Sequence, residues 1–187
     1  MTATLADAFF DDPVWSWTIP DRSLRRSRFS RLWAHLISCS IGAGWVFSTS
    51  GGDAVAMWDP PGVFVLEEPG ASALSDLIDR EFGEGADRLR GVLAAFDEHR
   101  PTTPHFYLNM LGVRDRSRGL GIGMALLSSN LGLVDEAIMP AYLESSNPRN
   151  IERYRSLGFA PHQTFSVAEG GPVVTTMWRE PRSVRRL

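Results

Sequence analysis

The residues with the clearest chemical signature form a glycine-rich segment, Arg118–Gly123, with the sequence RGLGIG. It follows an apolar run at 105–113 and leads into an apolar-periodic stretch that predicts a helix over 121–136. The first amides of a helix have no intrahelical acceptors and point the same way as the positive end of its dipole. Glycines let such a backbone approach a phosphate closely. The segment therefore predicts a site for a phosphate-bearing ligand.

Two familiar phosphate loops fit this segment poorly. A Walker loop requires Lys followed by Ser or Thr after its last glycine, but Met124 follows Gly123. A dinucleotide loop requires glycine at its first, third and sixth positions. Gly119 and Gly121 satisfy the first two, and the third glycine comes one residue early. The dinucleotide interpretation stays open, because Glu144 follows about twenty residues later at a predicted strand end, as that fingerprint requires.

A third pattern matches without adjustment. The motif R-x-x-G-x-G starts at Arg118 after one predicted strand, and N-x-x-x-Y-x-x-x-G-F starts at Asn150 after the next. In these paired motifs the chain resembles the GNAT superfamily of acyl-CoA N-acyltransferases. The resemblance covers about Leu5 to Trp178 and is strongest over 99–159. There, HRPTTPHFYLNMLGV and AYLESSNPRNIERYRSLGF are most similar to the puromycin N-acetyltransferase-like group within that superfamily.

The resemblance implies an α/β architecture, the GNAT fold. That fold has a mixed, mostly antiparallel twisted sheet, a central splayed pair of parallel strands, and helices on both faces. Such proteins usually begin with a strand before the first helix, whereas this chain begins MTATLADAFF, with no room for one. We expect a single domain over 1–187 that either lacks this edge strand or has a truncated or misassigned start.

The resemblance also implies acetyl-CoA as the co-substrate. The amides of the glycine-rich segment would hold its pyrophosphate, and the end of the preceding strand, 111–113, would pair with the pantetheine arm like an added strand. Asn150 would hold that arm near the thioester. The predicted cofactor-binding residues are Leu111, Gly112, Val113, Arg118, Gly119, Leu120, Gly121, Ile122, Gly123, Met124 and Asn150. The sequence has no metal-ligand cluster, and we expect no metal.

Tyr154 and Glu144 are the candidate catalytic residues. Aminolysis of a thioester expels a thiolate whose conjugate acid has a pKa near 8.5, by analogy with cysteine. A phenol, with a pKa of about 10, is protonated at neutral pH and can donate a proton to that thiolate. Glu144, at the end of the predicted strand 141–144, could draw a proton from the incoming ammonium. It could equally be an ordinary edge carboxylate that caps or forms a salt bridge.

Three residues are candidates for contacts with the acceptor amine. Trp15 and Trp17 lie in a predicted irregular link, 14–21, which lines the acceptor pocket in the resembled family but could also simply pack under a loop. His105 is either a base at the pocket edge or, the interpretation we favour, a strand residue with a satisfied ring. A helical insert at 63–100 is expected to reach toward the acceptor site.

Hydrophobic periodicity predicts the elements that must position these residues. The predicted helices cover 24–40, 72–82, 84–98, 121–136 and 149–157, and the predicted strands 45–48, 54–58, 105–113, 141–144, 162–167 and 173–178. Gly112, inside the central strand, indicates a bulge or a close approach by another backbone. The basic tail 180–187 is expected to be flexible.

Composition limits the classes of partner and location. A net charge of −3 gives no electrostatic case for nucleic-acid binding, and no apolar run approaches the roughly 18 residues of a membrane span. A single Cys and an acidic start without a signal peptide favour a cytoplasmic protein. Arginine-dominated positive charge with abundant Ala and Gly suggests a bacterial source. The chain is expected to be a monomer or homodimer.

These features predict an N-acetyltransferase. It would transfer an acetyl group from acetyl-CoA to a primary amine of a small molecule, antibiotic-like or a metabolite, by direct attack in a ternary complex. The alternative is a non-catalytic acyl-CoA-binding module with a sensing or regulatory role.

Overall fold

A six-stranded sheet, in the order β1-β2-β3-β4-β6-β5, forms the centre of the computed structural model, which describes residues 1–63 and 66–182. The strands are β1 (Val46–Ser48), β2 (Ala54–Asp59), β3 (Phe106–Val113), β4 (Ala141–Ser145), β5 (Ala160–Ser166) and β6 (Val173–Arg179). Only β3 and β4 are parallel, and every other neighbouring pair in the sheet is antiparallel. The predicted α/β fold with a central parallel pair in a mostly antiparallel sheet is therefore confirmed.

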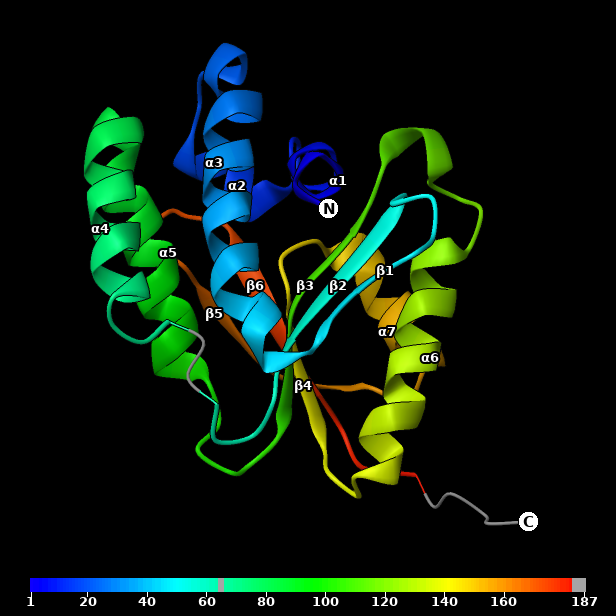
Figure 1. Cartoon of the computed structure of the whole chain (residues 1–187). Coiled ribbons are helices and arrows are strands. Elements are labelled where there is room, and N and C mark those ends of the chain that lie inside the picture. The colour runs from blue at the N-terminus through cyan, green and yellow to red at the C-terminus, as the bar shows by residue number, and fades with distance from the viewer. Residues whose placement is uncertain (64–65, 183–187) are drawn as a thin grey trace.

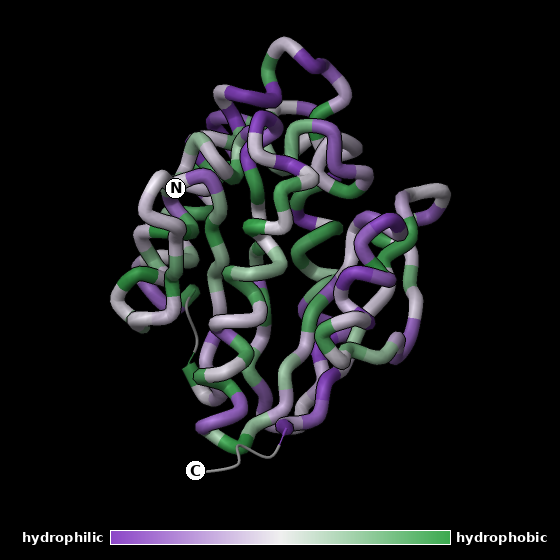
Figure 2. Tube along the Cα trace, turned by 90° about the vertical axis from the view of Figure 1, so that its right-hand side faces the viewer, coloured by the Kyte–Doolittle hydropathy of each residue, from purple (hydrophilic) through white to green (hydrophobic). Residues whose placement is uncertain are grey.

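Helices cover both faces of the sheet (Figure 1). They are α1 (Thr2–Ala8), α2 (Pro13–Thr18), α3 (Arg22–Ser40), α4 (Gly70–Glu81), α5 (Ala86–His99), α6 (Ile122–Glu136) and α7 (Ile151–Ser156). Alternation along β2 explains the two layers: Val55 and Met57 join the core beneath α1 and α3, whereas Ala56 and Trp58 join the core beneath α6. Figure 2 shows hydrophobic segments along the strands in the middle and hydrophilic segments at the outer loops.

A bulge in β3 separates it from β4. Parallel pairing covers only Phe106–Leu108 opposite Ala141–Leu143. On the other side of β3, Met110 and Leu108 pair with consecutive residues of β2, which leaves Asn109 as an extra residue. A bulge bends its strand, and here the bend begins where the parallel pairing ends. Among the described residues, no strand pairs with the β4-facing edge of β3 beyond Leu108.

Gly112 marks a close approach and not the bulge, which lies at Asn109. A Cβ added at Gly112 would stand 2.8 Å from Leu5 Cδ2 and 2.9 Å from Ala8 Cβ, closer than such atoms can pack. Glycine at this position therefore lets α1 lie directly against β3.

The predicted irregular link at 14–21 is wrong over its first half, because Pro13–Thr18 forms α2. Asp12 is the N-cap: its Oδ1 accepts hydrogen bonds from the amides of Val14, at 3.0 Å, and Trp15, at 3.3 Å. Pro13 does more than stop α1, since a proline is also well suited to the first position of a helix.

The remaining predicted segments are partly described. The insert forms α4 and α5, with Leu89 and Val92 buried, and its residues 64–65 lie outside the described residues. Residues 180–182 of the predicted tail are described, and the Arg182 amide donates to Asp135 Oδ1 at 2.8 Å; residues 183–187 lie outside. In the described part of the chain, no strand precedes α1. No helix there combines the length and apolar character needed to cross a membrane.

Candidate active site

A cavity of about 580 Å³ lies where β3 and β4 separate. Its lining comes from both sides of the sheet. The glycine-rich turn before α6 and residues of α7 contribute from one side, and α1, the start of α2 and Phe96 of α5 contribute from the other. Between them stand residues of β3 and β4, among them Asn109 and Glu144. Residues from both sides of the sheet therefore line one cavity.

The glycine-rich turn has the backbone geometry of a phosphate site. Gly119 and Gly121 have φ of +81° and +75°, values that L side chains rarely adopt. Gly121 is the N-cap of α6, and no side chain caps the first amides of this helix. A Cβ added at Gly123 would lie 2.6 Å from Val113 Cγ2, so the start of α6 sits directly on β3. Free amides at the N-terminus of a long helix favour an anion.

Nine of the eleven predicted cofactor residues line this cavity. They are Leu111, Val113, Arg118, Gly119, Gly121, Ile122, Gly123, Met124 and Asn150. Gly112 is outside the lining because it faces α1, and Leu120 is outside because it points to solvent, with 71% of its surface exposed. Arg118 donates to the Ala8 carbonyl at 2.8 Å and so ties the turn to the end of α1.

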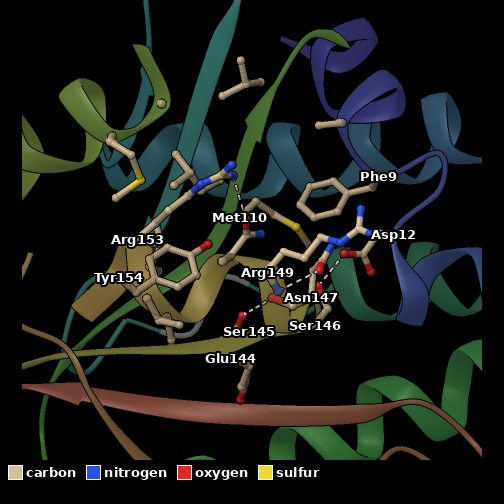
Figure 3. A pocket seen from close by; sticks show the side chains of 18 of the residues that line it. Phe9, Asp12, Met110, Glu144, Ser145, Ser146, Asn147, Arg149, Arg153 and Tyr154 are labelled. Carbon is tan, nitrogen blue, oxygen red and sulfur yellow. Dashed lines mark hydrogen bonds between the residues drawn. The ribbon is translucent and has the colours of Figure 1, made fainter. Parts of the chain in front are cut away.

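Tyr154 lies on α7 with its ring edge-on to Phe159, the two ring centroids being 6.1 Å apart. Figure 3 shows its hydroxyl pointing into the cavity, toward Met110. Burial, reinforced by the negative charge of Asp12, raises the pKa of the Tyr154 phenol to about 12. The phenol is therefore fully protonated at neutral pH and available as a donor.

Glu144 ends β4 and lines the same cavity. Tyr107 donates a hydrogen bond to its Oε2, and Tyr142 donates to its Oε1 at 3.0 Å. Burial raises the pKa of the Glu144 carboxyl to about 7, against the opposing effects of the Tyr107 hydrogen bond and the Arg100 charge. A carboxylate with this pKa can both accept and release a proton near neutral pH.

Of the three predicted acceptor contacts, the structure brings only Trp15 to the cavity. Trp17 lies two residues further along α2, on a different face, where its ring contacts the Arg88 guanidinium at 5.2 Å. His105 precedes β3, at the end away from the cavity, and its Nδ1 lies 2.6 Å from the Thr103 carbonyl oxygen. Burial lowers the pKa of the His105 imidazole. This geometry fits the satisfied-ring interpretation of His105.

Several lining residues were missed from the sequence. One of them is the buried Asp12, which also accepts a hydrogen bond from Ser146 Oγ at 2.6 Å. The Asp-Pro pair signals an N-cap, but nothing local signals its contact with the end of β4. Asn147 also lines the cavity, and its side chain accepts from the Arg149 amide at 3.1 Å. Phe96, from α5, closes one wall.

No metal site is evident in the described ranges. Within residues 1–63 and 66–182, no group of three or more His, Cys, Asp or Glu could hold a metal ion.

Comparison with known proteins gives relatives but no matching family model. An uncharacterized N-acetyltransferase of Schizosaccharomyces pombe is 26% identical over an alignment 203 residues long. The alignment covers 97% of this chain and 78% of that protein. A Corynebacterium glutamicum structure, described as histone acetyltransferase HPA2 and related acetyltransferase, has a TM-score of 0.67 and 26% identity, covering 99% of this chain and 91% of the other.

A more distant structure shows the fold alone. The C-terminal condensation domain of Ebony, in complex with beta-alanyl-dopamine, has a TM-score of 0.60 at 13% identity and covers 96% of this chain and 92% of its own. None of these relatives is described as a puromycin-modifying protein. The mixed sheet with one parallel pair and the two acetyltransferase relatives support an acetyltransferase of the GNAT superfamily.

Proposed function

We propose that this protein is an N-acetyltransferase that moves an acetyl group from acetyl-CoA to a primary amine of a small molecule, by direct attack in a ternary complex. The observation that carries the proposal is one cavity containing a protonated phenol, Tyr154, and a carboxylate with a pKa near neutrality, Glu144. The cavity lies beside a helix N-terminus with free amides.

The cofactor would be held mainly by backbone. The amides from Gly119 to Met124 would bind the pyrophosphate. The edge of β3 at Leu111–Val113, which lacks a β4 partner, would hydrogen-bond the amides of the pantetheine arm as a strand would. Asn150, whose Oδ1 accepts from Arg153 at 3.0 Å, would be held ready to bind the arm near the thioester. Acetyl-CoA, when bound, supplies the activated acyl group.

The side chains would handle two protons. Glu144 would accept one from the acceptor ammonium, leaving a neutral amine whose lone pair attacks the thioester carbonyl. As the C–N bond forms and the C–S bond breaks, Tyr154 would donate its proton to the departing sulfur. The nitrogen would then lose its second proton to the Tyr154 oxygen, directly or through water, which restores the phenol, and Glu144 would release its proton to solvent. No covalent nucleophile on the protein is needed, because bringing amine and thioester together lowers the barrier by itself.

The acceptor side of the cavity supports a small amine with an apolar part. Phe9, Trp15 and Phe96 provide aromatic surface, with the ring centroids of Phe9 and Trp15 6.1 Å apart and those of Trp15 and Phe96 6.3 Å apart. The carboxylates of Asp12 and Glu144 favour a cationic amine. The likeness to the puromycin N-acetyltransferase-like group suggests an antibiotic-like amine or a metabolite.

A thiol-release assay tests the proposal. Purified protein, acetyl-CoA and a panel of primary amines should produce free CoA thiol with some amines, and calorimetry should show CoA binding. Binding without thiol release for any amine would favour a non-catalytic acyl-CoA-binding module. Thermal protection by NAD(H) and none by CoA would favour the dinucleotide interpretation instead.

A further inference from the structure

Two tyrosines on adjacent strands donate hydrogen bonds to the carboxylate of Glu144. The parallel register places Tyr107 of β3 beside Tyr142 of β4, with ring centroids 5.7 Å apart. Tyr142 and Glu144 are two residues apart on β4, so they share a face of the sheet. As a result, one phenol reaches each oxygen of the carboxylate, Tyr107 at Oε2 and Tyr142 at Oε1.

These two hydrogen bonds orient the carboxylate but do not use all of its acceptor positions. An ionised carboxylate has about four acceptor positions, and the two phenols occupy one on each oxygen. Among the described residues, no other side chain or backbone group donates a hydrogen bond to this carboxylate, which leaves acceptor capacity for an ammonium. Tyr107 and Tyr142 are themselves 5% and 0% exposed, so both side chains are almost fully enclosed. Burial raises the pKa of both phenols, which keeps them as donors.

A cation lies behind the phenols. The Arg100 guanidinium carbon stands 4.2 Å from the centroid of the Tyr107 ring. Other charged or titratable groups near this cluster are Asp59, which accepts from Asn109 at 3.1 Å, and His99, whose carbonyl lies 3.3 Å from the Tyr142 hydroxyl. The His105 ring packs edge-on to the Tyr142 ring with centroids 5.2 Å apart, and the charge of Asp97 acts on Arg100. On the β6 side, the residue paired with Glu144 is the uncharged Thr176. Arg100 and the two phenols therefore oppose the effect of burial, which favours a neutral Glu144.

We propose that Tyr107 and Tyr142 are positioning residues, which together with Arg100 hold Glu144 in the orientation and ionised form required to accept the proton of the acceptor amine. This inference rests on the proposed acetyl transfer. Tyr142 and Arg100 do not line the cavity, so they would act on the acceptor only through Glu144. Tyr107 lines the cavity and also donates to Glu144.

The pH dependence of kcat/KM tests the proposal in the full-length protein with the best amine found. The wild-type rate should rise with pH and level off above about 7, where Glu144 ionises. In Tyr107→Phe, Tyr142→Phe and Arg100→Gln, this acid limb should move up by roughly one pH unit, because each change removes a group that stabilises the carboxylate. The rate at pH 6 should then fall by about tenfold, while the rate well above the limb falls much less.

Three measurements separate positioning from general damage. CoA affinity by calorimetry should stay at the wild-type value in all three variants. Tyr154→Phe should lower the plateau and leave the acid limb where it is, and Glu144→Gln should lower the plateau and remove the limb. If a tyrosine variant is unfolded at the assay temperature, Arg100→Gln still tests the proposal. Among the described residues Arg100 makes no hydrogen bond to Glu144, so this change removes a charge and no hydrogen bond to the carboxylate.

The possible failures are distinguishable. An unchanged acid limb in the folded variants, together with an inactive Glu144→Gln, overturns the positioning role and leaves the proposed function standing. A wild-type profile in Glu144→Gln overturns the assignment of the base, and with it this inference. Absence of thiol release from the wild type with every amine overturns the proposed function itself.

Discussion

At the scale of single residues, burial raises the pKa of both Tyr154 and Glu144, but the chemical results are opposite. It raises the pKa of the phenol to about 12, which secures its proton at neutral pH. It raises the pKa of the carboxyl to about 7, which makes it a better proton acceptor than an exposed glutamate. Under the proposed function, burial thus prepares an acid and a base for the two ends of the same transfer.

Tyr154→Phe tests the acid. Losing the hydroxyl removes the donor to the departing thiolate, and we expect kcat to fall by about 100-fold or more with CoA affinity little changed. Steady-state thiol release and CoA calorimetry measure the two quantities. Wild-type turnover in this variant would contradict the general-acid assignment.

At the scale of elements, α6 and β3 are brought together through one glycine. The start of α6 provides the free amides, and Gly123 is the residue through which it touches Val113 of β3. Under the proposed function, the helix N-terminus and the edge of β3 bind two parts of one CoA molecule, so the distance between them should affect CoA affinity.

Gly123→Ala should disturb that spacing. The new methyl group would meet Val113 Cγ2 at 2.6 Å, so the helix, the strand or the Val113 side chain must move. We expect CoA affinity to fall by about tenfold, a loss of about 1.4 kcal/mol. Gly132→Ala is the matched control, since it lies in the same helix with nothing within 4 Å of the added Cβ, and it should leave CoA affinity unchanged. Equal CoA affinities of the two variants by calorimetry would show that the contact between Gly123 and Val113 does not affect CoA binding.

The cap of α2 can be tested separately from its charge. Asp12→Ala removes the acceptor for the amides of Val14 and Trp15, and we expect unfolding free energy to drop by about 1 kcal/mol. Asp12→Asn should recover most of that loss, because asparagine caps helices about as well as aspartate. Urea unfolding followed by circular dichroism gives both values. Equal losses in the two variants would mean that the charge of Asp12, and not its cap, stabilises the fold.

At the scale of the whole molecule, one buried ion pair joins α6 to the last strand. Arg179 of β6 donates two hydrogen bonds, each 2.7 Å long, to the Asp135 carboxylate, and the side chains are 3% and 12% exposed. Burial opposes the charge on Asp135, but hydrogen bonds from Arg179 and Arg182 outweigh it and lower the pKa of this carboxyl. The pair therefore stabilises the protein above the unfolded pKa of about 3.8, and its contribution is lost as the pH falls further.

Asp135→Asn should be among the more destabilising conservative changes in this chain. It leaves a buried guanidinium without a counter-charge, and we expect a loss of about 3 kcal/mol at pH 7. Asp79→Asn is the control, since that carboxylate pairs with Arg90 at the surface and should change unfolding free energy by less than about 1 kcal/mol. Denaturant midpoints of the two variants measure both effects. Similar midpoints would contradict a large contribution of the buried Asp135–Arg179 pair to stability.

Local patterns in the amino-acid sequence alone determined the order of most elements and the place of the glycine-rich turn. Glycines at 119, 121 and 123 restrict backbone geometry within a few residues, and hydrophobic periods indicate which face of an element is buried. The same holds for Tyr154, whose motif spans only α7 and the residues at its two ends. The roles of the predicted site residues remain predictions, although nine of the eleven assigned to the cofactor line one cavity.

Only the tertiary structure decided which distant residues meet. The contact of Asp12 with Ser146 spans 134 positions, and that of Tyr107 with Glu144 spans 37. It also separated Trp15, which reaches the cavity, from Trp17, which does not. Such contacts depend on strand register and on the bulge at Asn109, and neither is written in a local pattern, because register is set by the sum of packing across the whole sheet.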